Sequence, residues 1–285
     1  ISTLSLSLSL CRRNGGEKQL RLWSRIQAAA SCPSGLSPSQ VSVVFNEAYD
    51  RIPHPDSSLE QSISEVWDAR DRQNSSLYDG PKFRGFVGTN LSPIWERYLV
   101  PSEDDCIQWQ HTSSPLGNGA VVETSDKKIL VLQRINKVGE FPGYFVFPGG
   151  HPEPQEVGII SHDGFQELNQ GRTINSKVSQ EMFDSIVCEV VEETGAPANS
   201  LSSPIFIGIS RRVLNVRPTA FFFIKCNLQS DEIQQLYSSV QNGFVSTQLY
   251  AVSMSDLENT ASKMPGCHRG GFALYKLMVQ GANGS

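Results

Sequence analysis

The chain has 285 residues, of which 39% are hydrophobic and 19% are charged, and its formal net charge is −5. This length suffices for one large domain or two smaller ones with a buried core, and the composition is typical of soluble globular proteins. A negative net charge without a Lys/Arg run argues against a nucleic-acid-binding or membrane-surface protein, and no stretch approaches the roughly 20 apolar residues of a membrane-spanning helix.

The cysteines bear on the cellular compartment. Six of them are scattered along the chain, with no CxxC pair and no spacing typical of a metal site. In a chain of this size the pattern indicates reduced thiols in an intracellular protein. We therefore expect a cytoplasmic protein, with a plastid or a mitochondrion as the alternative if the N-terminus is a transit peptide.

The first 39 residues differ in composition from the rest. Leu and Ser alternate over residues 4–10, no acidic residue precedes Glu17, and the sequence does not begin with Met. Three interpretations fit: a short amphipathic strand without an evident hairpin partner, an organelle transit peptide, or a leader translated from a CT dinucleotide repeat. We favour the leader and expect residues 1–39 to be disordered and to lie outside the fold.

Residues 40–114 are predicted to form a small, incomplete α+β module on the substrate side. The β-branched run VSVVF at 41–45 predicts a strand, and apolar residues at helical spacing predict an amphipathic helix over 58–73. Residues 74–85 have the composition of a loop, and a further short helix is expected to start at Ser92, with Pro93 in its first turn.

Residues 115–285 are predicted to form one domain in which strands and helices alternate. The strands are expected within 119–124, 128–134, 143–150, 204–213, 219–228 and 247–253, and the helices over about 180–194, 230–240 and 270–279. The nearly continuous apolar run at 219–228 indicates a central strand. This order favours an α/β sandwich with a mixed sheet and helices on both faces.

Three glutamates crowd the helix predicted over about 180–194. Glu189 and Glu193 share one face at i and i+4, and Glu192 flanks them. Carboxylates this close repel one another unless a cation neutralises them, and oxygen-only ligands favour Mg²⁺, with Mn²⁺ as an alternative. A solvated acidic face is the commoner fate of such a run, and this helix alone favours it.

The sequence FPGGHPEPQE changes that balance. Gly149 and Gly150 follow an apolar strand, where backbone can approach a phosphate or a metal. Gly150-x5-Glu156, followed by EVVEETGA at 189–196, resembles the Nudix box, G-x5-E-x7-R-E-U-x-E-E-x-G-U with U aliphatic. The box departs from its pattern in two ways: an insertion of 24 residues separates its halves, since 189 − 150 = 39 where the pattern has 15, and Cys188 stands at the arginine position.

Sequence segments in and around the box narrow the resemblance to one branch of the family. PGGHPEPQ, PLGNGA at 115–120, LYDGPKFR at 77–84 and FVGTN at 86–90 look like the branch of Nudix hydrolases that acts on UDP-glucose and UDP-galactose. That resemblance runs from about Val41 to the C-terminal helix. It implies a Nudix-type α/β/α sandwich that cleaves the diphosphate of a nucleotide-sugar, a small-molecule substrate, to UMP and sugar 1-phosphate.

The resemblance also implies roles for particular residues. Glu189 and Glu193 become the principal metal ligands, and Glu192 becomes a further ligand or a base for water. The turn at Gly150 shapes the metal site through its backbone. Three residues are substrate-binding candidates. His151 would bind a phosphate or sugar hydroxyl, Arg134 would bind the diphosphate, and Tyr78 would stack on uracil. The alternatives are a surface loop residue for His151, a solvated strand end for Arg134 and simple packing for Tyr78.

Two departures from the relatives' pattern leave a second hypothesis open. Arg84 is followed at once by Gly85 and the FVGTN element, where the relatives have a longer segment. No acid stands at 243–245, where a loop ligand would be expected. The alternative is therefore a catalytically weak protein that binds a nucleotide-sugar, or a diphosphatase for ADP-ribose or coenzyme A. Without the box arginine, Arg172 or Lys177 is expected to reach back to the glutamates.

Overall fold

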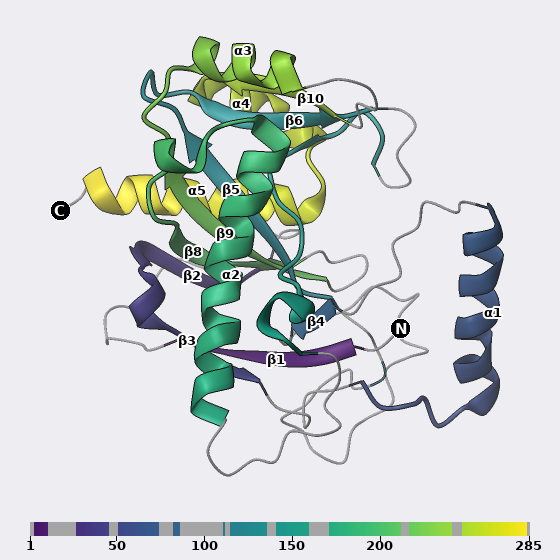
Figure 1. The fold of residues 1–285 in the computed structure, drawn as a ribbon. Helices are drawn as coiled ribbons and strands as arrows, with labels where there is room; N and C mark the ends of the chain where they lie inside the picture. Colours follow the sequence, from purple (N-terminus) through teal and green to yellow (C-terminus); the bar gives the residue numbers. More distant parts are fainter. Residues whose placement is uncertain are drawn as a thin grey trace.

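A mixed sheet forms the centre of the protein (Figure 1). The computed structural model describes residues 3–10, 27–45, 51–73, 82–85, 111, 115–135, 141–159, 171–211, 217–240 and 247–283. The sheet has seven strands in the order β10-β6-β5-β9-β8-β2, and β7 pairs with β6. Their bounds are β2 Gln27–Leu36, β5 Gly117–Glu123, β6 Ile129–Arg134, β7 Phe145–Val146, β8 Ile205–Arg211, β9 Pro218–Lys225 and β10 Thr247–Val252.

Helices cover both faces of this sheet, which confirms the predicted α/β/α sandwich. The buried side chains of α2 (Gly171–Thr194) and α3 (Ser230–Val240) join one core cluster, whereas those of α4 (Met254–Thr260) and α5 (Gly266–Asn283) join a second. In Figure 1, α2 crosses the sheet on the side opposite α5. Short 3-10 turns lie at Pro38–Gln40, Pro154–Val157, Ala198–Ser200 and Ala261–Lys263.

Strand β9 is the most deeply buried element of the sheet. It pairs in parallel with β5 and antiparallel with β8, and every residue of it except Lys225 is buried. Its alternating phenylalanines therefore serve both cores: Phe222 packs edge-to-face on Phe183 of α2, and Phe221 faces α5. The prediction of a central strand from its apolar run is confirmed, since a strand covered on both faces needs no polar side.

Two glycines allow α5 to lie close to the sheet. A Cβ at Gly119 of β5 would come within 2.8 Å of the Phe221 ring, and a Cβ at Gly271 of α5 would overlap the same ring. The ring of Phe221 therefore fills the space that side chains would otherwise need on both elements. This packing fixes α5 across the face of the sheet that is opposite the acidic helix.

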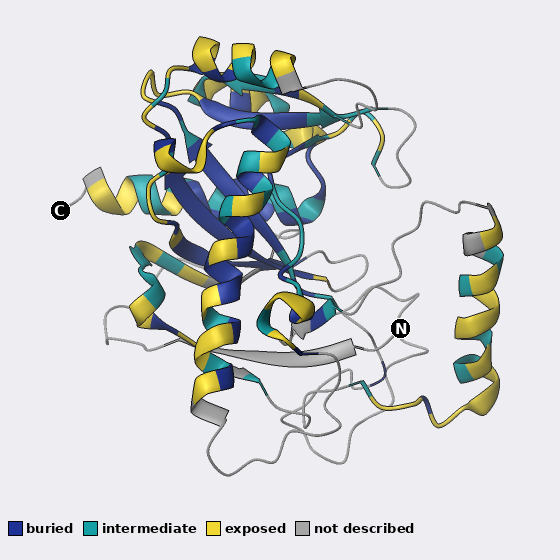
Figure 2. Cartoon of the chain, in the orientation of Figure 1, coloured by how far each residue is buried: buried dark blue, intermediate teal, exposed yellow. Residues whose placement is uncertain are grey.

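Helix α2 is longer than the sequence predicts. It ends as expected at Thr194, where Gly195 is left-handed (φ 73°) and its N–H bonds to Val191 O at 2.9 Å. It begins at Gly171 rather than near Gln180, because Ile174 and Val178 continue the buried stripe at four-residue spacing. From Thr173 onward, α2 has a buried and an exposed side (Figure 2).

A second, three-stranded sheet has the order β3-β1-β4 and contains residues we expected to be disordered. β1 (Thr3–Leu10) pairs antiparallel with β3 (Val41–Phe45) and in parallel with β4 (Lys82–Gly85). Strand β2 also lies within the first 39 residues, at the edge of the main sheet beside β8. The expectation of disorder is therefore wrong for β1 and β2, since both strands find distant partners rather than a hairpin neighbour.

The remaining predictions for the N-terminal half have mixed outcomes. The strand at β3 and the amphipathic helix, α1 (Ser57–Gln73), are confirmed. Part of the predicted loop over 74–85 is instead strand β4. The helix expected from Ser92 lies outside the described residues. No helix in the described residues combines the length and apolarity of a membrane span. The described cysteines, Cys32, Cys188, Cys226 and Cys267, are free thiols.

Candidate active site

Helix α2 brings two of its glutamates to one loop. Ile186 and Val190 belong to the fully buried stripe of the helix, and Glu189 and Glu193 lie beside this stripe, against the turn at Gly149 and Gly150. Gly149 N donates to Glu193 Oε2 at 2.8 Å, and the backbone N–H of His151 bonds to Glu189. The predicted convergence of these glutamates on the glycine turn is thus present in the structure, one loop amide per carboxylate.

Gly150 is the tightest contact in this arrangement. A Cβ there would overlap the Glu189 carboxylate, and a Cβ at Gly149 would lie 2.7 Å from the Gly119 Cα. No other amino acid fits either position without displacing β5 or the carboxylate. The two glycines therefore let the loop backbone sit between the sheet and the acidic helix.

Asn118 of β5 holds the loop in place, and the sequence analysis missed it. Its Oδ1 accepts from Gly150 N at 2.8 Å, and its own N–H donates to Gly150 O at 2.9 Å. Its Nδ2 donates to Ser185 Oγ on α2 at 2.9 Å, in a buried setting. A polar residue between two glycines in an otherwise apolar strand, as in PLGNGA, is the signal that could have identified it.

Burial and mutual repulsion make this carboxylate pair reluctant to ionise. Burial raises the pKa of Glu193 to about 8; the Gly149 amide opposes this, Glu189 raises it further, and Arg134 lowers it. Burial also raises the pKa of Glu189. The hydrogen bond from the His151 amide lowers this pKa, and the charge of Glu192 raises it. Glu192 itself is exposed, so it stands apart from the other two. A bound cation would favour the ionised form of both Glu189 and Glu193.

The donor set of this site fits a hard divalent cation. Glu189 and Glu193 offer carboxylate oxygens at i and i+4, beside a glycine turn that has no room for a side chain. Mg²⁺ prefers oxygen ligands and retains several waters. Within the described ranges, however, no three His, Cys, Asp or Glu side chains lie close enough together to form a metal centre. Positions 243–245, where a loop ligand was expected, lie outside those ranges.

Arg134 lies on the same side of the sheet as the glutamates. It follows Leu130 and Leu132 of β6, which belong to the core under α2, and its charge lowers the pKa of Glu193. Its backbone is fixed, since its N–H donates to Tyr144 O at 3.0 Å. Its Nε is buried and finds no hydrogen-bond partner in the part of the chain that the structure describes. A buried guanidinium N–H of this kind suits an anionic ligand.

Two other predictions for the site have different outcomes. Tyr78 lies outside the described residues, so its stacking role remains a prediction. The idea that Arg172 or Lys177 reaches back to the glutamates is wrong, because both lie within α2 rather than in a loop. Lys177 precedes Glu189 by twelve helical residues, a separation of about 18 Å along the axis. Cys188 at the arginine position is exposed.

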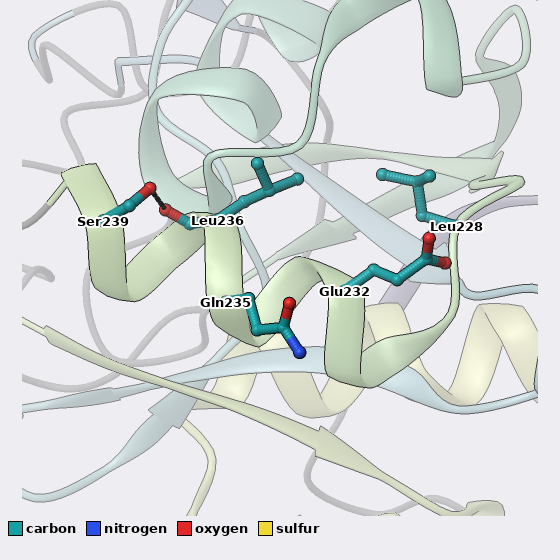
Figure 3. A pocket seen from close by; sticks show the side chains of 5 residues that line it. All are labelled: Leu228, Glu232, Gln235, Leu236 and Ser239. Atoms are coloured by element: carbon teal, nitrogen blue, oxygen red, sulfur yellow. Dashed lines mark hydrogen bonds between the residues drawn. The ribbon is translucent and has the colours of Figure 1, made fainter.

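A surface hollow of about 340 Å³ lies elsewhere, beside α3 (Figure 3). Its lining residues are Leu228, Glu232, Gln235, Leu236 and Ser239. Glu232 already accepts from Gln229 N, just before α3, and Ser239 Oγ donates to Leu236 O within the helix, so both polar groups have local partners. The hollow is not lined by Glu189, Glu192 or Glu193. The chemistry of the glycine turn therefore identifies the candidate site better than this shape does.

The chain is similar to known proteins over most of its length. No family model matches the chain. It is 59% identical over 286 residues to Nudix hydrolase 9 of Arabidopsis thaliana, and the aligned region covers 90% of this chain and 92% of that protein. It is 31% identical over 240 residues to uridine diphosphate glucose pyrophosphatase NUDT22 of Mus musculus, covering 73% of this chain and 74% of that protein.

A solved structure of a Nudix hydrolase from Nitrosomonas europaea aligns with 58% of this chain and 88% of its own, at 16% identity and a TM-score of 0.36. The identity to the Arabidopsis thaliana protein extends over nearly the whole of both chains. On those sequence relatives, the chain belongs to the Nudix hydrolase family.

Proposed function

We propose that this protein is a Mg²⁺-dependent pyrophosphohydrolase that cleaves a UDP-sugar, UDP-glucose or UDP-galactose, to UMP and the sugar 1-phosphate. Family membership supports hydrolysis of a diphosphate, and relatives about 31% identical are named as uridine diphosphate glucose pyrophosphatases. The observation that carries the proposal is the convergence of Glu189 and Glu193 on the glycine turn, with the buried Nε of Arg134 on the same side.

In this proposal Glu189 and Glu193 hold the ion, and the amides of Gly149 and His151 orient the two carboxylates. The bound ion would neutralise charge on the diphosphate. Arg134 would bind the diphosphate oxygens through its guanidinium fork. Glu192, which is exposed, would act as a further ligand or take a proton from the attacking water. The water oxygen bonds to one phosphorus as the bond from that phosphorus to the bridging oxygen breaks.

The substrate class is tested by a panel of diphosphates with Mg²⁺: UDP-glucose, UDP-galactose, ADP-ribose and coenzyme A. We expect UMP and sugar 1-phosphate from the first two, with a kcat/KM above that for the others. Faster cleavage of ADP-ribose or coenzyme A would overturn the UDP-sugar assignment while leaving a Nudix diphosphatase. Cleavage of none of them, with UDP-glucose binding retained, would favour the second candidate, a nucleotide-sugar-binding protein.

One observation favours that second candidate. The box arginine is replaced by Cys188, whose thiol carries no charge because local desolvation, followed by the charge of Glu192, raises its pKa. A box without its usual cation would leave the glutamates less firmly oriented and would weaken metal binding. The metal affinity of this protein therefore depends on whether another residue supplies this support.

A further inference from the structure

The carboxylates around the glycine turn need a cation that α2 does not supply. Glu189 and Glu193 face the turn, and Glu181 lies two helical turns earlier on α2, 8% exposed, with a pKa raised by burial. Cys188 offers no positive charge, and Lys177 is too far along the axis. A cation that acts on this cluster must therefore come from an element packed against the helix or the loop.

Lys82 of β4 is placed to do this. Its Nζ lies 3.2 Å from Glu153 Oε1, and its side chain is only 20% exposed. Its neighbour Phe83 is completely buried and accepts a hydrogen bond from Leu116 N at 2.8 Å, immediately before β5 begins. The backbone of Lys82 is thus held by the packing of its neighbour, and its side chain is mostly shielded from solvent beside Glu153.

Glu153 carries the effect of Lys82 to the site. It belongs to the same loop as Gly150, three residues further along, and its N–H donates to Glu181 Oε1 of α2 at 2.9 Å. The loop is thereby held at two points, by Asn118 at Gly150 and by Lys82 and Glu181 at Glu153.

We infer that Lys82 is the positioning residue that stands in for the missing box arginine, fixing the glycine loop against α2 so that Glu189 and Glu193 keep their orientation. The inference rests on the proposed function in taking these glutamates as metal ligands, but it does not depend on which diphosphate is cleaved. It also gives the second sheet a role, because β4 delivers a cation to a site that the main sheet and α2 otherwise form.

The test is a Mn²⁺ titration of the substrate-free protein followed by electron paramagnetic resonance. Lys82→Met is expected to weaken Mn²⁺ binding by about 10- to 100-fold, the usual effect of losing a group that orients metal ligands. Lys82→Arg should restore most of the affinity. Lys276→Met is the matched control, because Lys276 also pairs with a glutamate, Glu258 at 3.5 Å, and is 28% exposed, but lies on α5.

Cys188→Arg gives a second, independent arm. If Lys82 does the work of the box arginine, restoring an arginine at 188 should recover Mn²⁺ binding in Lys82→Met. If Lys82→Met does not fold, as judged by circular dichroism, Glu153→Gln removes the same ion pair and should show the same loss. Unchanged Mn²⁺ binding in Lys82→Met or in Glu153→Gln would overturn the inference. Tighter binding would also overturn it, because removal of a lysine that merely repels the ion would have this effect.

Activity then separates the inference from the proposed function. A substrate-binding lysine would raise the KM for UDP-glucose without changing the Mn²⁺ affinity of the free protein, and that result would overturn the positioning role. A wild type that binds Mn²⁺ through Lys82-dependent glutamates but leaves UDP-glucose intact would overturn the proposed substrate alone. A wild type that binds no Mn²⁺ would overturn both.

Discussion

Gly150 leaves no room for a side chain beside Glu189 at the candidate site. In Gly150→Ala the new Cβ would overlap the Glu189 carboxylate, so the loop or the glutamate must move. We expect a loss of roughly 100-fold in kcat/KM for UDP-glucose, since a shift of about 1 Å in a positioned group has this effect.

Gly117→Ala is the control for this change. A Cβ at Gly117 would meet Thr219 Oγ1 at 3.4 Å and Gly150 O at 3.5 Å, which is ordinary contact at the edge of the same loop. Its activity should stay near that of the wild type. Equal activity in both variants would show that the contact between Gly150 and Glu189 does not matter.

The raised pKa of Glu193 predicts how pH acts on the metal-free protein. A carboxyl whose pKa rises to about 8 on folding, from an ordinary value of 4.5, contributes its full stability below 4.5 and loses it as the pH rises through 8. The free energy of unfolding of the metal-free protein should therefore fall between pH 5 and pH 8, and Glu193→Gln should remove much of this slope in urea titrations.

Metal binding should follow the opposite trend with pH. Because the ion binds the ionised carboxylate, Mn²⁺ affinity should increase as the pH rises toward 8 and then level off, with protons released on binding. Affinity measured from pH 6 to pH 9 by paramagnetic resonance tests this. A flat profile would mean that Glu193 is already ionised at pH 6 or does not bind the metal.

At the scale of single residues, the sequence identified those site residues whose role shows in the nearby sequence. Glu189, Glu193 and Gly150 follow from the i, i+4 spacing and from a glycine pair after a strand, and the structure brings them together. Asn118 and Lys82 were missed because their contacts, to Gly150 and Glu153, connect elements far apart in sequence. No periodicity in the chain encodes such a pairing.

Among the helices that were predicted and lie in the described residues, α2 departs most from its expected bounds. Its first half, rich in Thr, Asn and Ser, has weak helix propensity, yet Ile174 and Val178 are buried against the core and Asn175 Oδ1 accepts from Phe45 N of β3 at 2.8 Å. Packing thus stabilises a segment that local propensity would leave as a loop. The start of α2 could not be read from the sequence for this reason.

Val178→Ala tests this explanation. Val178 is completely buried, so removing two methyl groups should lower the free energy of unfolding by about 2 kcal/mol, through lost burial and the cavity left behind. Lys177→Ala, at the exposed neighbouring position, should change it by less than about 0.5 kcal/mol. Urea unfolding of the metal-free proteins measures both, and equal effects would contradict the packing of this half of α2.

Elements with strong local signals were predicted closely. Strand β3 and helix α3 have the bounds expected from a β-branched run and from an amphipathic run that starts at Ser230. Strands β1, β2 and β4 were not, because a strand of alternating Leu and Ser, or a short run such as KFRG, becomes recognisable only once its distant partners are known.

At the scale of the whole molecule, the N-terminal residues complete the main sheet. β2 covers the edge of β8, with Cys32 and Leu36 packed on the core beneath α2. Deleting residues 1–36 should therefore lower the Tm by about 5 °C or more relative to deletion of residues 1–26, which keeps β2. Equal melting temperatures in scanning calorimetry would show that β2 adds nothing to the fold, as a disordered leader would.

We propose that the paired glutamates of α2 make this Nudix protein a metal-dependent UDP-sugar hydrolase. The most direct measurement is hydrolysis of UDP-glucose to UMP and glucose 1-phosphate with Mg²⁺, comparing the wild type with Glu193→Gln. We predict turnover in the wild type, its loss on chelation of the metal, and a decrease of about 100-fold or more in the variant. Equal turnover in the two proteins would contradict the assignment of Glu193 and, with it, the account of the site.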